Sequence, residues 1–204
     1  MLTMPLKILG ALGCSLETIA IIHRVNKLRI ALIRNEVNPK SSRLILYRNQ
    51  LEHTLTGLIQ SLGPDEQLGE TPARRSHIMA IAELYRIGAL LYIFHVVPLR
   101  GDEKHRKTYL DQALSILERL EVATSPWPVF MVACECQTDE QRIRILQIMD
   151  LMEDKRNMGS VRVMRTLTET CWKRSDLEAD STRTRGTKWW KFANYYETDV
   201  PWFI

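Results

Sequence analysis

The sequence Trp127-Pro-Val-Phe-Met-Val-Ala-Cys-Glu-Cys136 is the most informative stretch of the chain. It follows Ser125-Pro, and proline is favoured in the first turn of a helix. The residues after the prolines are apolar except for Glu135, and a buried carboxylate has to be paired or hydrogen-bonded. We therefore expect a buried helix in which Glu135 pairs with Arg142 or Arg165 of a neighbouring helix. An ion pair that locks two helices is favoured over a catalytic acid.

Helical periodicity extends from this stretch in both directions. Ser15 and Asp102 are expected helix caps, Gly13 is an expected helix stop, and residues 138–141 form a Thr-Asp-Glu-Gln capping box. Besides the helix that begins at Ser125, the expected helices cover residues 2–12, 16–35, 43–62, 73–97, 103–120, 139–153, 161–173 and 187–196. No β-hairpin signal is recognised. The predicted fold class is all-α, an irregular multi-helix bundle of about seven to nine helices.

The segment 73–97 is the longest and most apolar of these helices, so it is expected to be the central one. Its apolar run over residues 87–97 is much shorter than the roughly 20 residues of a membrane span. We expect a buried core helix and no membrane association. A small ligand, if the protein binds one, is expected beside this helix, in a pocket near Tyr85, Leu91, Tyr92 and His95.

The composition is that of an ordinary globular protein, with 45% hydrophobic and 25% charged residues among 204. The net charge of +4 is too small and diffuse to indicate nucleic-acid binding by itself. We expect a single helical domain over residues 1–204, with N-terminal helices at 1–62, a central core at 73–176 and an aromatic tail at 187–204. In that tail, Trp189 or Trp190 is expected to cap the core and not to stack on nucleic acid.

No metal centre is expected from the four cysteines. Cys134 and Cys136 lie about 200° apart around a helix axis, and no second pair with metal-ligand spacing exists. The cysteines are interpreted as reduced thiols of an intracellular protein. The chain is therefore expected to hold no cofactor.

The sequence also lacks the motifs of an active site. It has neither a nucleophile elbow nor a glycine-rich phosphate loop. Asp150, Glu153 and Asp154 share a helix face, as acids around magnesium would, but Lys155 and Arg156 follow at once. Local ion pairs on a solvated face are the favoured interpretation, and no enzymatic activity is expected.

Taken in order, several motifs resemble those of the fungal-specific transcription factor domain. The residues Gly13-Cys-Ser-Leu-Glu17 are similar to a helix start of that family, and residues 83–92 resemble its central helix. The stretch 127–135 is similar to its Trp-Pro-Leu-Phe…Gly-Cys-Glu signature, with Ala133 where glycine is usual. The resemblance covers residues 6–204, with the tail tryptophans Trp189 and Trp202 included. Its motif residues are Trp127, Pro128, Cys134, Glu135, Arg142 and Trp172.

The resemblance implies the helical regulatory region that follows a Zn₂Cys₆ DNA-binding cluster in fungal transcription factors. It implies a non-catalytic, nuclear role in transcription regulation through a protein partner or self-association, and a small-molecule effector is a further option. The cluster needs six closely spaced cysteines, whereas this chain has four scattered ones, so zinc-mediated DNA binding is not expected.

The resemblance also implies that the chain has about the length of the C-terminal half of the usual region. It is then expected to be a fragment, a shortened gene product or a stand-alone regulator, and a half-length domain is expected to leave apolar surface uncovered. Three alternatives stay open. They are a ligand-binding helical protein, an all-α protein of secondary metabolism, and a helical scaffold without a role in transcription.

Overall fold

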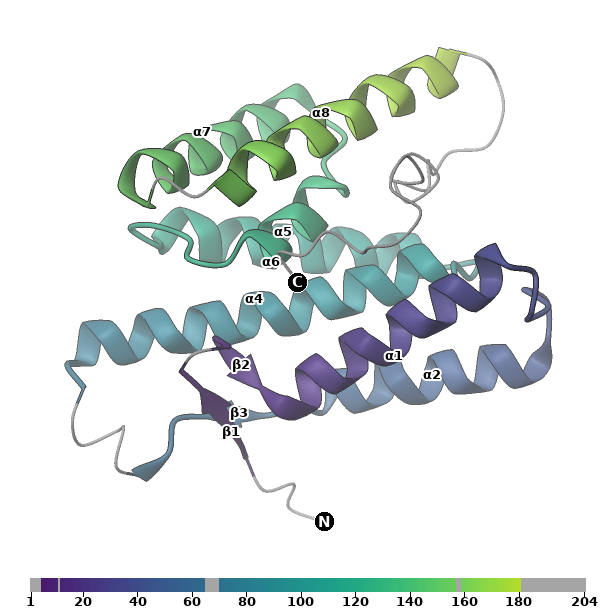
Figure 1. The fold of residues 1–204 in the computed structure, drawn as a ribbon, viewed down its shortest axis with the longest axis horizontal. Coiled ribbons are helices and arrows are strands. Elements are labelled where there is room, and N and C mark those ends of the chain that lie inside the picture. The colour runs from purple at the N-terminus through teal and green to yellow at the C-terminus, as the bar shows by residue number, and fades with distance from the viewer. Residues whose placement is uncertain (1–4, 11, 65–69, 157–158, 181–204) are drawn as a thin grey trace. The chain divides into compact units, whose positions relative to one another are not determined.

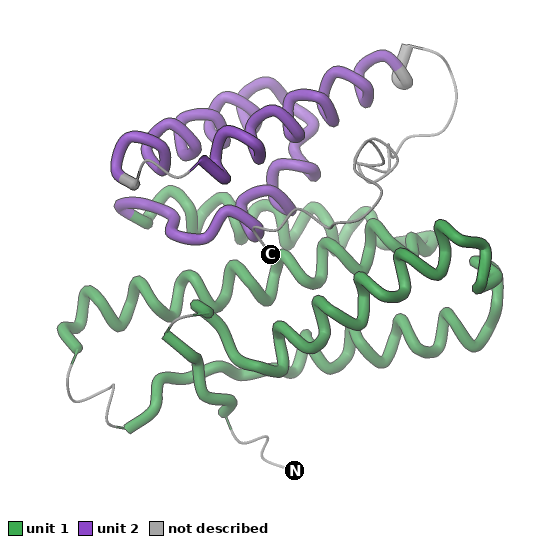
Figure 2. Tube along the Cα trace, viewed as in Figure 1, with its two compact units in different colours: residues 1–120 green, residues 121–204 purple. Residues whose placement is uncertain are grey.

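The computed structural model describes residues 5–10, 12–64, 70–156 and 159–180, and the chain divides into two compact units (Figure 2). Unit 1 comprises residues 1–120 and unit 2 comprises residues 121–204. The described residues form seven helices and three short strands, so the all-α prediction is confirmed. The boundary between the units falls inside residues 73–176, which the sequence analysis treats as one core.

Unit 1 is built around one long helix, α4 (Pro72–Val96), which packs against α1 (Leu16–Ile33), α2 (Ser42–Thr56) and α5 (Asp102–Arg119) (Figure 1). Every residue of α4 from Ile87 onward is buried. By length and composition this helix could cross a membrane, but 67% of its apolar window is buried inside the structure. That degree of burial is typical of the core helix of a soluble protein and agrees with the expected central position.

A small sheet stands where the sequence analysis expects a first helix. Strand β1 (Leu6–Leu9) pairs antiparallel with β2 (Cys14–Ser15) and parallel with β3 (Gln60–Ser61). The predicted helix over residues 2–12 is therefore wrong for its described part. Gly13 has φ +73° and forms the turn of a β1–β2 hairpin instead of ending a helix.

The same sheet explains why α2 ends early. The helix was expected to reach residue 62, but it ends at Thr56, because Gly57 caps it and residues 60–61 pair with β1. The side chain of Gln60 is buried here. Its Oε1 accepts hydrogen bonds from Ser15 N at 2.8 Å and Thr18 Oγ1 at 3.2 Å, while its Nε2 donates to Ala82 O at 2.7 Å. Gln60 thus ties the sheet to α1 and α4.

Unit 2 contains α6 (Pro126–Ala133), α7 (Asp139–Arg156) and α8 (Gly159–Asp180), and each of these helices packs against the other two. The capping box predicted for α7 is confirmed. Gln141 N donates to Thr138 Oγ1 at 3.3 Å, and Thr138 N donates to Gln141 Oε1 at 3.2 Å. The predicted start of α6 at the Ser125-Pro sequence is also confirmed.

Two details of unit 2 differ from the sequence-based expectation. The apolar spacing of α7 predicts an inward-facing stripe of Ile143, Leu146, Ile148, Met149 and Met152. Ile143 is instead 54% exposed, and Ile145 is buried. Because apolar residues occur all around α7, the pattern alone does not fix which face is buried. In addition, α8 continues to Asp180, seven residues beyond the predicted helix over residues 161–173. The predicted helix over 187–196 and the aromatic tail lie outside the described residues.

Candidate functional site

The motif residues of α6 are buried as a group. Trp127 and Pro128 belong to the first turn of the helix, and both are buried, as is every other residue of α6 after Pro126. Proline fits this turn because its missing N–H would have no partner inside the helix. The motif therefore acts as a packing element of unit 2.

Trp172 of α8 contacts the C-terminal end of α6. Its indole Nε1 donates a hydrogen bond of 2.8 Å to the main-chain oxygen of Ala133, the last residue of α6. Arg142 of α7 also contacts Trp172, because its guanidinium carbon lies 5.5 Å from the centroid of the Trp172 ring. Cation–π contacts of this kind add to the burial of the aromatic ring. Three helices thus meet at one tryptophan.

Arg142 is held in turn by Asp176 of α8. Its two terminal nitrogens lie 2.8 Å and 2.7 Å from the two carboxylate oxygens of Asp176, a bidentate pair. The hydrogen bond from Arg142 lowers the pKa of Asp176, and the hydrogen bond to Asp176 raises the pKa of Arg142. Arg142 therefore links α7 to α8 both through Asp176 and through Trp172.

Glu135 is only 4% exposed, as the sequence predicts. Arg142 pairs with Asp176, and Arg165 pairs with Asp150 of α7. These pairs do not exclude a further contact with Glu135, so the pairing of Glu135 with one of the two arginines stays a prediction. Burial, followed by the charge of Glu135, raises the pKa of the Cys136 thiol to about 12.

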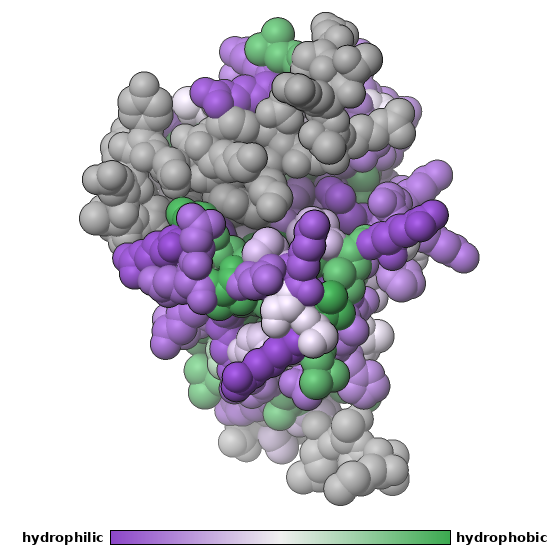
Figure 3. All heavy atoms as spheres, turned by 90° about the vertical axis from the view of Figure 1, so that its right-hand side faces the viewer, coloured by the Kyte–Doolittle hydropathy of each residue, from purple (hydrophilic) through white to green (hydrophobic). Residues whose placement is uncertain are grey.

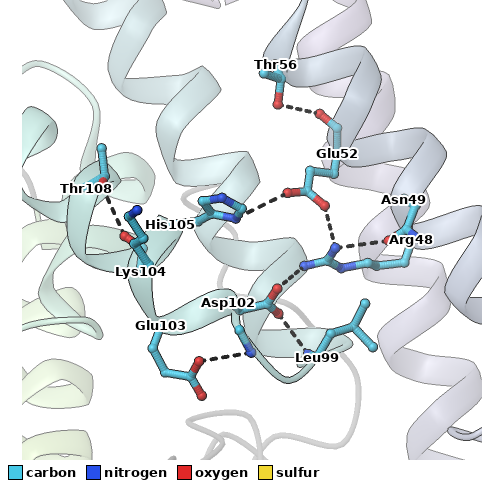
Figure 4. Close-up of polar contacts among 11 residues, drawn as sticks. Arg48, Asn49, Glu52, Thr56, Leu99, Asp102, Glu103, Lys104, His105 and Thr108 are labelled. Atoms are coloured by element: carbon cyan, nitrogen blue, oxygen red, sulfur yellow. Dashed lines mark hydrogen bonds and ion pairs between the residues drawn. The ribbon is translucent and has the colours of Figure 1, made fainter.

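Unit 1 contains a buried ionic network that the sequence patterns do not predict (Figure 4). Arg48 of α2 is 3% exposed, and its Nη2 lies 2.7 Å from Oδ1 of Asp102 at the start of α5. Its Nη1 pairs with Glu52, whose other carboxylate oxygen lies 4.0 Å from Nδ1 of His105. The guanidinium carbon of Arg48 also lies 4.9 Å from the centroid of the Phe94 ring in α4. The network joins three helices of unit 1.

A sequence signal for this network does exist. Arg48 occurs at helical spacing between Leu44, Leu51 and Leu55, which are the buried residues of α2. A charged residue on an apolar stripe needs a buried partner. Asp102 was interpreted only as a cap of the next helix, whereas Gly101 occupies the capping position and Asp102 lies inside α5. Besides Arg48, the Asp102 carboxylate accepts a 2.8 Å hydrogen bond from Leu99 N.

The residues of the expected ligand pocket all belong to the buried core of unit 1. Tyr85, Leu91, Tyr92 and His95 are each at most 8% exposed. The hydroxyl of Tyr92 donates to Oδ1 of Asn26 in α1 at 3.2 Å, and burial raises the pKa of Tyr92 to about 12. The four side chains are brought together along α4, but a pocket beside them stays a prediction.

Within residues 5–10, 12–64, 70–156 and 159–180, no group of three or more His, Cys, Asp or Glu side chains could hold a metal ion. Two of the three acids considered for magnesium form ion pairs with arginines of α8. Asp150 pairs with Arg165, and Arg162 Nε lies 2.6 Å from Glu153 Oε1. The distinctive polar residues of the described structure thus connect helices to one another.

The fold and these contacts define a helical domain whose most characteristic residues act in packing. The chain belongs to the family of the fungal specific transcription factor domain, whose sequence profile matches residues 5–202. This membership confirms the resemblance and places the chain among proteins of transcription regulation.

One curated relative is Transcription factor iacI of Pestalotiopsis fici, which is 30% identical over 100 residues. The match covers 48% of this chain and 26% of that protein, so it spans about a quarter of the relative's length. No solved structure matches the chain.

Proposed function

We propose that this chain is a non-catalytic regulatory domain that acts in the nucleus through protein contacts and does not read DNA through a zinc cluster. Family membership over residues 5–202 is the observation that carries the proposal. The contacts at Trp172 and Arg48 support the non-catalytic part of the proposal. In both places charged and aromatic side chains connect one helix to another.

Exposed apolar side chains provide surface for such contacts. Large hydrophobic residues in the described part of the chain that face solvent include Leu16 in unit 1, at 63% exposed, and Leu177 in unit 2, at 70%. Leu6, Leu12 and Ile59 are further exposed residues at or next to the small sheet. On the face drawn in Figure 3, green hydrophobic residues lie among purple hydrophilic ones. Single exposed apolar residues are common on protein surfaces, so their role has to be tested by substitution.

The experiment fuses the full chain to an unrelated DNA-binding domain and measures a reporter gene carrying the matching binding sites. We expect the fusion to change reporter expression severalfold relative to the DNA-binding domain alone. An unchanged reporter, with the fusion present in the nucleus at normal abundance, would contradict a regulatory role.

Substitutions then test whether exposed apolar residues carry the effect. Leu16→Gln and Leu177→Gln keep the side-chain size and remove apolar surface, and Lys40→Gln is the control with the same new residue at an exposed position. We expect at least one leucine variant to weaken the reporter response at unchanged protein abundance, and the control to leave it intact. Equal responses from all three variants would argue against contacts through these residues.

A further inference from the structure

The N-terminal end of α4 lies outside the core of unit 1. No residue from Thr71 to Ala80 is buried, and the buried positions of the helix begin at Ile81. In Figure 1 this end of α4 reaches beyond the small sheet. The first four of these residues, from Thr71 to Arg74, are all exposed. Thr71 is therefore within reach of another protein.

These four residues, Thr71-Pro-Ala-Arg74, have the sequence that proline-directed protein kinases recognise. Such kinases phosphorylate a serine or threonine directly before a proline, and the cyclin-dependent class favours a basic residue two positions after that proline. A kinase binds its substrate segment in an extended conformation, and a residue before proline is biased toward this region of φ and ψ. Thr71 has φ −65° and ψ 152°, so its backbone already has the required conformation.

Ser125 is a matched comparison, because it is the other serine or threonine of the chain that directly precedes a proline. Its side chain is half-buried. The two residues after its proline are Trp127 and Pro128, and both are buried in α6. No basic residue occupies the position that Arg74 has relative to Thr71. Ser125 therefore lacks both the accessibility and the positive charge that Thr71 offers to a kinase.

We propose that Thr71 is a phosphorylation site of a proline-directed kinase, with ATP as the phosphate donor. The Oγ1 atom of Thr71 attacks the γ-phosphorus of ATP, the bond from this phosphorus to the β–γ bridging oxygen breaks, and ADP leaves. The hydroxyl proton passes to the catalytic aspartate of the kinase. The product is a phosphothreonine that carries a charge of about −1.5 to −2 at pH 7. The proposal concerns Thr71 alone and does not depend on whether the chain regulates transcription.

The first turn of α4 can accommodate the added negative charge. The Thr71 hydroxyl accepts a hydrogen bond from Arg74 N at 3.3 Å, and Arg74 Nε lies 2.8 Å from Glu70 Oε2. Arg75 follows with a second positive charge. A phosphate at the N-terminus of a helix is stabilised by the positive end of the helix dipole. We therefore expect phosphorylation to change the charge of residues 70–76 from positive to negative while α4 stays folded.

The test incubates the full chain with a purified cyclin-dependent kinase, magnesium and ATP, digests the product and maps the phosphorylated peptides by mass spectrometry. A synthetic Ser-Pro-Ala-Arg peptide in the same reaction verifies that the kinase is active. We expect Thr71 to be phosphorylated and Ser125 to remain unmodified. The circular dichroism spectrum of the phosphorylated chain is expected to match that of the unmodified chain.

An active kinase that leaves Thr71 unmodified would overturn the proposal, as would phosphorylation of Ser125 at the same rate. A product that has lost helix content would also overturn it, because the kinase would then have acted on unfolded chain. Among variants, Pro72→Ala keeps the hydroxyl and is expected to slow phosphorylation by at least an order of magnitude. Arg74→Gln is expected to slow it severalfold, and Arg75→Gln, the same substitution one position later, to leave the rate unchanged. Equal rates for the wild type and Pro72→Ala would exclude a proline-directed site.

Discussion

The indole nitrogen of Trp172 donates its hydrogen bond to the main-chain oxygen of Ala133, which also accepts one from Cys136 N at 3.1 Å. A carbonyl at the C-terminal end of a helix has no partner from the helix itself. Trp172 supplies one from a different helix. The end of α6 is thus fixed by a side chain 39 positions further along the chain.

Removing this hydrogen bond is expected to destabilise unit 2. Trp172→Phe keeps an aromatic ring but loses the N–H donor, and we expect the free energy of unfolding to fall by about 1–3 kcal/mol. Trp172→Ala also removes the ring and is expected to cost about 3–5 kcal/mol. Urea denaturation followed by circular dichroism measures both. Lys173→Ala, at the exposed neighbouring position, is the control and should change stability by less than about 0.5 kcal/mol.

Substitution of Glu135 tests whether its burial needs a charge partner. We expect Glu135→Ala to lower the free energy of unfolding by about 3 kcal/mol. Removing one member of a buried ion pair leaves the other charge buried without compensation. Glu135→Gln keeps the shape and a hydrogen-bonding group, so it should cost less. Denaturant unfolding of the two variants provides the comparison. A loss below about 0.5 kcal/mol for Glu135→Ala, which is typical of a surface substitution, would contradict a stabilising interaction of the buried Glu135 side chain.

The helices and their caps could be predicted from the sequence because those signals are local. The Thr138 and Gln141 capping box needs only two side chains on adjacent turns. Ser15 was also predicted as a cap, and its Oγ accepts from Thr18 N at 3.3 Å. Likewise the apolar length of α4 identifies the core helix of unit 1 without knowledge of its neighbours. The family resemblance rests on the order of such local motifs.

Features that depend on distant segments could not be predicted. Strand β1 is four residues long and exists because β3, more than 50 positions away, pairs with it. The partners of Arg142 and Arg165 depend on how α7 packs against α8. The sequence alone offers both Asp176 and Glu135 as possible partners of Arg142. The contact of Arg48 with Asp102 spans 54 positions. In each case the decisive atom belongs to a helix or strand that no local pattern identifies.

The buried pair of Arg48 and Asp102 leads us to expect a definite order of stability among variants of Asp102. Asp102→Ala removes one of the two carboxylates that pair with the buried Arg48 guanidinium. We therefore expect the free energy of unfolding to fall by about 3 kcal/mol. Asp102→Asn retains an acceptor for the hydrogen bond from Leu99 N and removes only the charge, and it should lie between Asp102→Ala and the wild type. Chemical denaturation ranks the three proteins.

An exposed ion pair of unit 1 serves as the control for that ranking. Arg24 and Glu17 lie 3.9 Å apart in α1, and both side chains are more than one-third exposed. Because solvent screens such pairs, Glu17→Gln should change the free energy of unfolding by less than about 0.5 kcal/mol. Equal effects of Glu17→Gln and Asp102→Asn would mean that the Arg48 network contributes no more than a surface pair.

The pair of Arg142 and Asp176 predicts a specific dependence of stability on pH. The hydrogen bond from Arg142 holds the pKa of Asp176 below its usual value of 3.8. A carboxyl whose pKa is lower in the folded state stabilises the fold above the unfolded-state pKa, and this stabilisation is lost as the pH falls through the folded-state pKa. Asp176→Asn should therefore differ from the wild type at neutral pH and converge with it in acid.

The size of that difference is limited by exposure. Asp176 has 58% of its side chain exposed, so we expect Asp176→Asn to cost no more than about 1 kcal/mol at neutral pH. Urea unfolding of both proteins at a series of pH values gives the difference, and NMR titration of the Asp176 carboxyl carbon gives its pKa. Because both proteins carry the same other carboxyls, their common acid denaturation cancels in the comparison. A difference that stayed constant below the measured pKa would show that Asp176 stabilises α7 against α8 by packing and not by its charge.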